Sequence, residues 1–183
     1  MKKVKKYIKG KAAVFIDVSN IYYSQQTMGW HIDYEKLYKL FQYETNLAVA
    51  YFYSGIVSNN QSQHKFFKKM KKFGYVVKTK EVKWIKDRKS KILKGKGNLD
   101  IELALDMSQQ IGKYHTAILL SGDSDFVPVV QFAIDKKRKV VVISSRGHVA
   151  KELIQAATTY IPFESIRALV ERKKSPPTKR GDV

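Results

Sequence analysis

The most constraining feature of the sequence is an apolar run that stops abruptly at a turn carrying two carboxylates. The run covers residues 118–120, and it is followed by Ser121, Gly122, Asp123, Ser124 and Asp125. A short apolar run bounded by turn residues is typical of a strand buried in a parallel sheet. Such sheets bind their ligands beyond the carboxyl ends of the strands. Two acids one residue apart at that edge repel each other unless a cation neutralises them, which indicates a divalent metal.

Similar apolar runs alternate with helical patterns through most of the chain. We expect strands at 12–17, 47–53, 75–77, 116–121, 140–144 and 161–163, and a strand or hairpin at the sheet edge over 79–85. Strands that alternate with helices predict an α/β domain with a central, mainly parallel sheet. One expected helix, 64–73, carries five lysines on one face, and its apolar side chains should face inward: Phe66, Phe67, Met70 and Phe73.

Helix starts are predicted from polar side chains that can accept a hydrogen bond from the backbone. Asp33 and Asn98 are each placed to cap the helix that follows. Either Ser19 or Asn20 could cap a short helix after the first strand, and Asn20 could equally serve a metal site.

Length and composition suit one globular domain. The chain has 183 residues, 44% of them hydrophobic, and no cysteine. The absence of cysteine excludes disulfide frameworks and zinc sites built on cysteine. No apolar run approaches the ~20 residues that span a bilayer, and the N-terminus lacks the apolar core of a signal peptide. We therefore expect a cytoplasmic protein: a flexible basic arm at 1–11, a domain at 12–171 and a basic disordered tail at 172–183.

The charge balance indicates a polyanionic partner. Lys and Arg number 35 against 16 Asp and Glu, a formal charge of +19. Residues 61–98 alone hold 14 basic and 2 acidic residues. Such an excess favours nucleic acid, although a solvated charged surface is the alternative. Trp84 and Tyr75 lie among these lysines, either as stacking residues or as core aromatics. We expect basic side chains to guide a nucleic-acid strand toward the acids. They are Lys83, Lys86, Arg88, Lys89, Lys91, Lys94, Lys96 and, at the carboxyl ends of the β-strands, Arg146.

Four aspartates fall at predicted strand ends or helix starts along one sheet edge: Asp17, Asp100, Asp123 and Asp125. Carboxylate sites without cysteine favour hard ions, here Mg²⁺ or Mn²⁺. Such ions lower the pKa of bound water and stabilise phosphoryl oxygens. Asp106 lies six residues after Asp100, about 600° around a helix, so it should point away from Asp100.

Competing catalytic motifs are weak. The sequence has no GxxxxGK[ST] loop, which argues against a P-loop ATPase, and Gly95–Gly97 does not extend to a dinucleotide fingerprint. The four histidines have no metal-ligand spacing. Ser121 and Ser124 lack an evident histidine partner, which argues against a serine-hydrolase triad. His148 could contact a phosphate, but such residues more often cap or pack.

Three blocks of the sequence resemble the NYN domain of the LabA-like group, a branch of the PIN-like nucleases. They are 15–20 (FIDVSN), 96–106 (KGNLDIELALD) and 121–126 (SGDSDF), in motif order over roughly residues 12–165. The resemblance implies a three-layer α/β/α, Rossmann-like fold and Mg²⁺- or Mn²⁺-dependent cleavage of RNA. It implies Asp17, Asp100, Asp123 and Asp125 as metal ligands, with Asn20 and Ser121 in support. Asp106 matches a recurrent family acid of less certain role, and Val18 stands where the family usually has glycine.

Three functions remain open from the sequence. The first is an RNA endonuclease that acts on single-stranded or structured RNA. The second is a non-catalytic RNA- or DNA-binding protein whose acidic pocket is vestigial or structural. The third is a phosphatase of small phosphoesters, against which the charge excess argues. The other partner that we consider is a second copy of the chain, as a homodimer.

Overall fold

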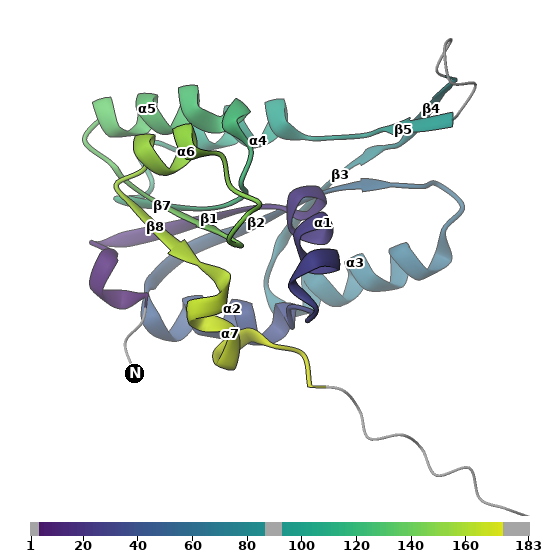
Figure 1. Cartoon of the computed structure of the whole chain (residues 1–183), viewed down its shortest axis with the longest axis horizontal. Helices are drawn as coiled ribbons and strands as arrows, with labels where there is room; N and C mark the ends of the chain where they lie inside the picture. The colour runs from purple at the N-terminus through teal and green to yellow at the C-terminus, as the bar shows by residue number, and fades with distance from the viewer. Residues whose placement is uncertain (1–3, 87–92, 174–183) are drawn as a thin grey trace, which may run out of the picture.

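The computed structural model describes residues 4–86 and 93–173. A six-stranded parallel sheet lies between two layers of helices (Figure 1). Its strands are β1 (Lys11–Asp17), β2 (Asn46–Ile56), β3 (Val76–Glu81), β6 (Thr116–Leu120), β7 (Lys139–Ser144) and β8 (Thr159–Pro162). The helices are α1 (Val18–Met28), α2 (Tyr34–Glu44), α3 (Gln61–Phe73), α4 (Asp100–Gln109), α5 (Val127–Asp135), α6 (Lys151–Ala156) and α7 (Phe163–Val170). This arrangement confirms the predicted three-layer α/β/α fold.

The strand order places one crevice at the centre of the sheet. The order is β3-β2-β1-β6-β7-β8, so the chain first builds outward from β1 on one side and then from β6 on the other. β1 and β6 are neighbours, with Ile16 opposite Leu120. The connections on either side of this pair run in opposite directions, which is the arrangement that opens a ligand crevice at the carboxyl ends of the strands.

Each central strand feeds two hydrophobic cores because its side chains alternate between the faces of the sheet. In β1, Val14 and Ile16 belong to the core under α1, α2, α3 and α7. Phe15, between them, belongs to the core under α4, α5 and α6. A strand buried on both faces reads as a continuous apolar run, which is why the central strands were predictable from sequence.

The N-terminal segment packs against the domain from Val4 onward, which differs from the flexible arm that we expected. Val4 is fully buried, and a 3₁₀ turn, η1 (Lys5–Tyr7), follows it. The backbone amides of Val4 and Lys5 donate to Glu44 Oε2 at 2.8 and 3.0 Å. Lys9 then exchanges two hydrogen bonds with the hydroxyl of Thr116. These contacts tie the segment to the end of α2 and to β6.

A separate two-stranded hairpin leads from the sheet edge to α4. Its strands, β4 (Lys83–Lys86) and β5 (Leu93–Lys96), pair antiparallel with Lys83 opposite Lys96. The hairpin projects away from the central sheet (Figure 1). Three of the residues that we expect to guide a nucleic-acid strand lie outside the described residues: Arg88, Lys89 and Lys91. Most of the predicted tail, 174–183, lies outside them too.

No helix in the described ranges is both long and apolar enough to cross a bilayer.

Candidate acidic site at the sheet edge

Asp17 lies at the centre of the crevice, where β1 ends and α1 begins. Its carboxylate is 7% exposed. Asp17 Oδ1 accepts from the backbone amide of Asn20 at 3.2 Å, and Oδ2 accepts from Ser121 Oγ at 2.9 Å. Burial raises the pKa of Asp17, and nearby Asp123 raises it further. Asp17, and neither Ser19 nor Asn20, therefore caps α1.

Asn20 holds the turn after β6 against α1. Its side-chain oxygen accepts from the amide of Gly122 at 2.9 Å. The carbonyl of Gly122 accepts from Ala150 N at 2.8 Å. A Cβ at position 122 would lie 1.7 Å from the carbonyl oxygen of His148, a distance that real atoms do not reach. Only glycine therefore permits these three segments to meet. A role of Asn20 in a metal site stays a prediction.

Asp123 and Asp125 follow in the same turn. Asp123 N donates to Ser121 Oγ at 3.2 Å, which places Ser121 between Asp17 and Asp123. Asp123 Oδ1 accepts from Asp125 N at 3.0 Å and so caps the 3₁₀ turn η2 (Ser124–Phe126). Asp123 is half-buried and Asp125 is exposed.

Asp100 reaches the same place from α4. It is half-buried at the first residue of the helix, where Asn98 Nδ2 donates to its Oδ2 at 2.6 Å. The predicted cap was wrong, because Leu99 holds the N-cap position and Asn98 binds the acid instead. Burial raises the pKa of Asp100 to about 6, followed by repulsion from Asp17, Asp123, Asp125 and Glu102. Four carboxylates from three segments thus influence one another.

The carboxylate oxygens of the four aspartates are ligands that suit a hard cation, but the side chains are not arranged around one. All four acids offer carboxylate oxygens, the ligands that Mg²⁺ and Mn²⁺ prefer. Within residues 4–86 and 93–173, no three His, Asp or Glu side chains are arranged to hold a metal ion.

Asp106 lies apart from these acids, on another face of α4, as the helix geometry predicted. It is 9% exposed. Asp106 Oδ2 accepts from the hydroxyl of Tyr53 at 2.7 Å, and Lys78 Nζ lies 2.6 Å from the same oxygen. Burial and the adjacent carboxylate both raise the pKa of Tyr53. Asp106 is therefore paired with a cation and a phenol inside the fold.

Among the residues that we expect to guide a nucleic-acid strand, Lys83 and Arg146 are exposed. Arg146 follows β7 at the same sheet edge, and its backbone amide donates to Glu164 Oε1 at 3.1 Å. The backbone of β4 and β5 carries Lys86, Lys94 and Lys96 on the hairpin. His148 Nε2 forms a hydrogen bond with Thr27 Oγ1, which gives this histidine a partner between α1 and the loop before α6.

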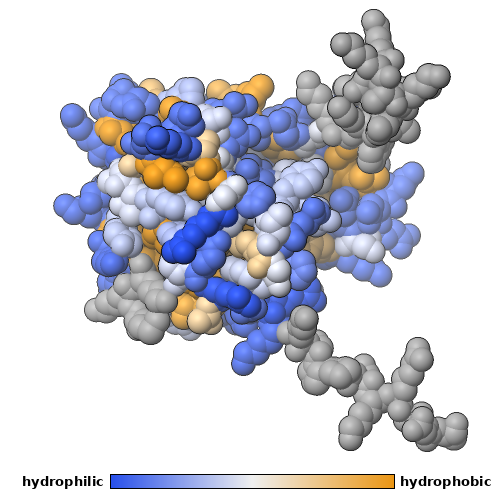
Figure 2. Space-filling view, viewed as in Figure 1, coloured by the Kyte–Doolittle hydropathy of each residue, from blue (hydrophilic) through white to orange (hydrophobic). Residues whose placement is uncertain are grey.

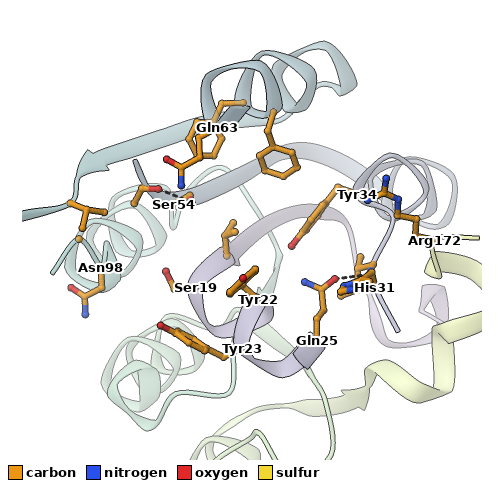
Figure 3. A pocket seen from close by; sticks show the side chains of 17 residues that line it. Ser19, Tyr22, Tyr23, Gln25, His31, Tyr34, Ser54, Gln63, Asn98 and Arg172 are labelled. Carbon is orange, nitrogen blue, oxygen red and sulfur yellow. Dashed lines mark hydrogen bonds between the residues drawn. The ribbon is translucent and has the colours of Figure 1, made fainter. Parts of the chain in front are cut away.

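A hollow of about 700 Å³ opens beside the acids and was not foreseen from the sequence (Figure 3). Its walls come from α1, the start of α2, the end of β2, α3 and the loop before α4. Phe66 was expected in the core, but its side chain is 36% exposed and lines this hollow. The sequence feature that could have indicated the hollow is the pair Tyr22-Tyr23, shortly after the block 15–20. In sequence this pair cannot be told from ordinary helix residues.

Comparison with known proteins agrees with the fold. A model of the NYN domain family matches residues 11–166. The chain is 33% identical over 169 residues to the low amplitude and bright protein LabA of Synechococcus elongatus, which covers 91% of this chain and 90% of that protein. A crystal structure of a protein of unknown function from Vibrio parahaemolyticus is similar, with a TM-score of 0.72 and 26% identity over 84% of this chain and 93% of that one. The chain belongs to the NYN domain family, within the PIN-like nucleases.

Proposed function

We propose that the protein is a metal-dependent ribonuclease that hydrolyses RNA phosphodiester bonds at the acidic site. The proposal is supported by the positions of Asp17 at the end of β1, Asp100 at the start of α4, and Asp123 and Asp125 in the turn after β6, all in a strongly basic chain with its crevice between β1 and β6. Burial and four neighbouring acids raise the pKa of Asp100, and within the described residues no basic side chain offsets them. A site that gathers negative charge and leaves it uncompensated is suited to a cation.

The four aspartates would hold Mg²⁺ or Mn²⁺. When bound, such an ion supplies activation of water and stabilisation of charge on the phosphate. Ser121 and Asn20 fix the carboxylate of Asp17 and the turn that carries Asp123, so this part of the site is ordered in advance. Arg146, which is exposed beside the same edge, would bind a phosphate of the substrate.

The basic surface would concentrate RNA around the site. Hydrophilic residues cover most of the face seen in Figure 2, and apolar residues form small separate patches. A formal charge of +19 attracts a polyanion over distances of the order of the Debye length, ~8–10 Å at physiological salt.

The direct test is cleavage of end-labelled single-stranded RNA with Mg²⁺ or Mn²⁺. We expect Asp123→Asn to lower the rate at least ~100-fold, since it removes a ligand charge. Asp135→Asn is a matched control, because Asp135 is an exposed acid at the far end of α5. Equal rates for wild type and Asp123→Asn, or full cleavage in EDTA, would contradict the proposal.

One observation favours a second candidate, a non-catalytic RNA- or DNA-binding protein. The described acids do not enclose a metal as they stand. Under this alternative no divalent metal gives turnover, and nucleic-acid binding still weakens steeply with salt. The same assay separates the two, because it measures binding and cleavage on one substrate.

A further inference from the structure

The hollow beside the acids is lined by aromatic side chains from three helices (Figure 3). Tyr22 and Tyr23 come from α1, Tyr34 from the start of α2 and Phe66 from α3. Its volume, about 700 Å³, lies within the range of sites that bind small ligands, ~300–1,000 Å³. The hollow is therefore large enough for more than one nucleotide unit.

The aromatic surface in the hollow is exposed to solvent. Tyr22 is 59% exposed, Tyr23 65% and Phe66 36%. Each ring is supported by a neighbour: Tyr22 meets Tyr23 edge-to-face at 5.9 Å, and Phe66 meets Tyr34 edge-to-face at 6.0 Å. Rings held in place with open faces are what base stacking requires, because stacking needs a flat, accessible surface at little entropic cost.

The hollow adjoins the acidic site. Ser19, two residues after Asp17, lines it, and so does Asn98, whose amide binds Asp100 at 2.6 Å. The lining residues of the described chain include no Asp or Glu, while they do include the amides of Gln25 and Gln63. The negative charge thus stops at the rim, and the lining of the hollow includes aromatic and polar side chains together with the cationic Arg172. This division matches a nucleotide whose phosphate lies at the acids and whose base enters the hollow.

The outer face of α3 continues the surface with positive charge. The helix has five exposed lysines, no acidic residue, and two aromatic residues on the wall of the hollow. The lysines are Lys65, Lys68, Lys69, Lys71 and Lys72. A basic helix next to stacking rings is the combination that binds single-stranded nucleic acid without sequence preference.

We propose that this hollow is a base-stacking subsite for single-stranded RNA, with a base against Tyr22 and Phe66 and the phosphate backbone along the lysines of α3. The inference rests on the proposed ribonuclease function for the nature of the polymer. It assigns substrate specificity to unpaired RNA, because a base held in a duplex cannot enter the hollow.

The test measures binding in EDTA, which separates it from catalysis. The probe is a fluorescein-labelled RNA of about 12 nucleotides, followed by fluorescence anisotropy at fixed salt. We expect Tyr22→Ala to raise Kd ~10-fold and Tyr22→Phe to leave it near wild type. Tyr43→Ala is the matched control, since Tyr43 is an 82% exposed tyrosine on α2 that does not line the hollow.

An abasic RNA of the same length sharpens the test. Wild type should bind it more weakly than normal RNA, and Tyr22→Ala should cause no further loss, because the stacking partner is gone. In parallel, Lys65→Gln with Lys68→Gln should flatten the dependence of log K on log salt by ~1, and Lys113→Gln should flatten it less. Lys113 is exposed in the turn between α4 and β6.

A Kd for Tyr22→Ala within twofold of wild type, or an equal loss on normal and abasic RNA, would overturn the subsite. Duplex RNA that binds as tightly as the single strand would do the same. Tyr22-dependent binding without turnover in Mn²⁺ would instead refute only the ribonuclease. Turnover with a Kd that is unchanged by Tyr22→Ala would refute only the subsite.

Discussion

The acids at the sheet edge and Asp106, which lies apart from them on α4, differ in how their charge is compensated. Asp106 has Lys78 Nζ at 2.6 Å and the Tyr53 hydroxyl at 2.7 Å. The carboxylates of Asp17, Asp100 and Asp123 accept hydrogen bonds from amides and, at Asp17, from Ser121. Within the described residues, the charged groups that shift the pKa of Asp17 and Asp100 are other acids. One α-helix, α4, supplies a member to each group, since Asp100 and Asp106 face different ways.

This difference separates an acid that stabilises the fold from acids that are available to bind a cation. A buried carboxylate with its own lysine is already neutralised, so a cation gains little there. Carboxylates that repel one another store an unfavourable energy, which a cation can relieve. The protein has 35 basic residues, yet within the described residues no ion pair joins a lysine to any of these four acids.

The largest expected contrast is in activity. Asp17→Asn should lower RNA cleavage at least ~100-fold, because it removes the most buried carboxylate of the site. Asp106→Asn should keep most of the activity, since Asp106 meets Lys78 and Tyr53 away from the crevice. Both variants are compared by single-turnover cleavage under saturating Mn²⁺. Equal losses would show that the two groups act as one site.

The next contrast is in stability. Asp106→Ala should lower the free energy of unfolding by ~2 kcal/mol, because it leaves the Tyr53 hydroxyl and Lys78 without their shared acceptor. Urea denaturation reports the change, with Asp135→Ala as the exposed control. A loss below ~0.5 kcal/mol would mean that the pair is only a surface contact.

A smaller effect of opposite sign is expected at Asp100. Its folded pKa, about 6, lies above the unfolded value of 3.8, so its ionisation destabilises the fold as pH rises from about 4 through 6. Asp100→Asn should therefore stabilise the metal-free protein at pH 7.5, by ~1 kcal/mol after allowance for its partial exposure, and change little at pH 4. Calorimetry at both pH values measures this. Destabilisation at pH 7.5 would contradict an uncompensated site.

The smallest effect concerns Glu102, between the two groups. It pairs with Lys80 at 2.7 Å, with side chains 39% and 51% exposed. Glu102→Gln loses that pair but also removes a charge that raises the pKa of Asp100, so the two effects oppose each other. We expect a net change under ~0.5 kcal/mol by urea denaturation. A larger loss would place Glu102 with the compensated acids.

The sequence predicted the fold because its central strands are buried on both faces. Runs such as 12–17 and 116–121 have few polar interruptions, and Asp33 caps its helix as expected, accepting from Glu35 N at 3.0 Å. The caps at Asp17 and Leu99 were missed for a physical reason. The side chain of Asn20 binds the amide of Gly122, which is 102 residues away in the chain and close only after folding. The side chain of Asn98 binds the carboxylate of Asp100 in place of a backbone amide of the helix.

The acidic site was partly predictable and the hollow was not. A carboxylate at a strand end is visible locally, and the strand order of a parallel sheet then gathers such residues. The compensation of Asp106 depends on Lys78, 28 residues away on another strand, and no local pattern reveals it. Phe66 has the spacing of a core residue, yet the space opposite it on α1 is left open.

The hairpin between β3 and α4 is paired as a sheet of its own, outside the register of the six central strands. Its length and composition can therefore drift by insertion or deletion without shifting β1 or β6. An insertion or deletion in this hairpin should leave Asp17, at the end of β1, and Asp123, in the turn after β6, in place.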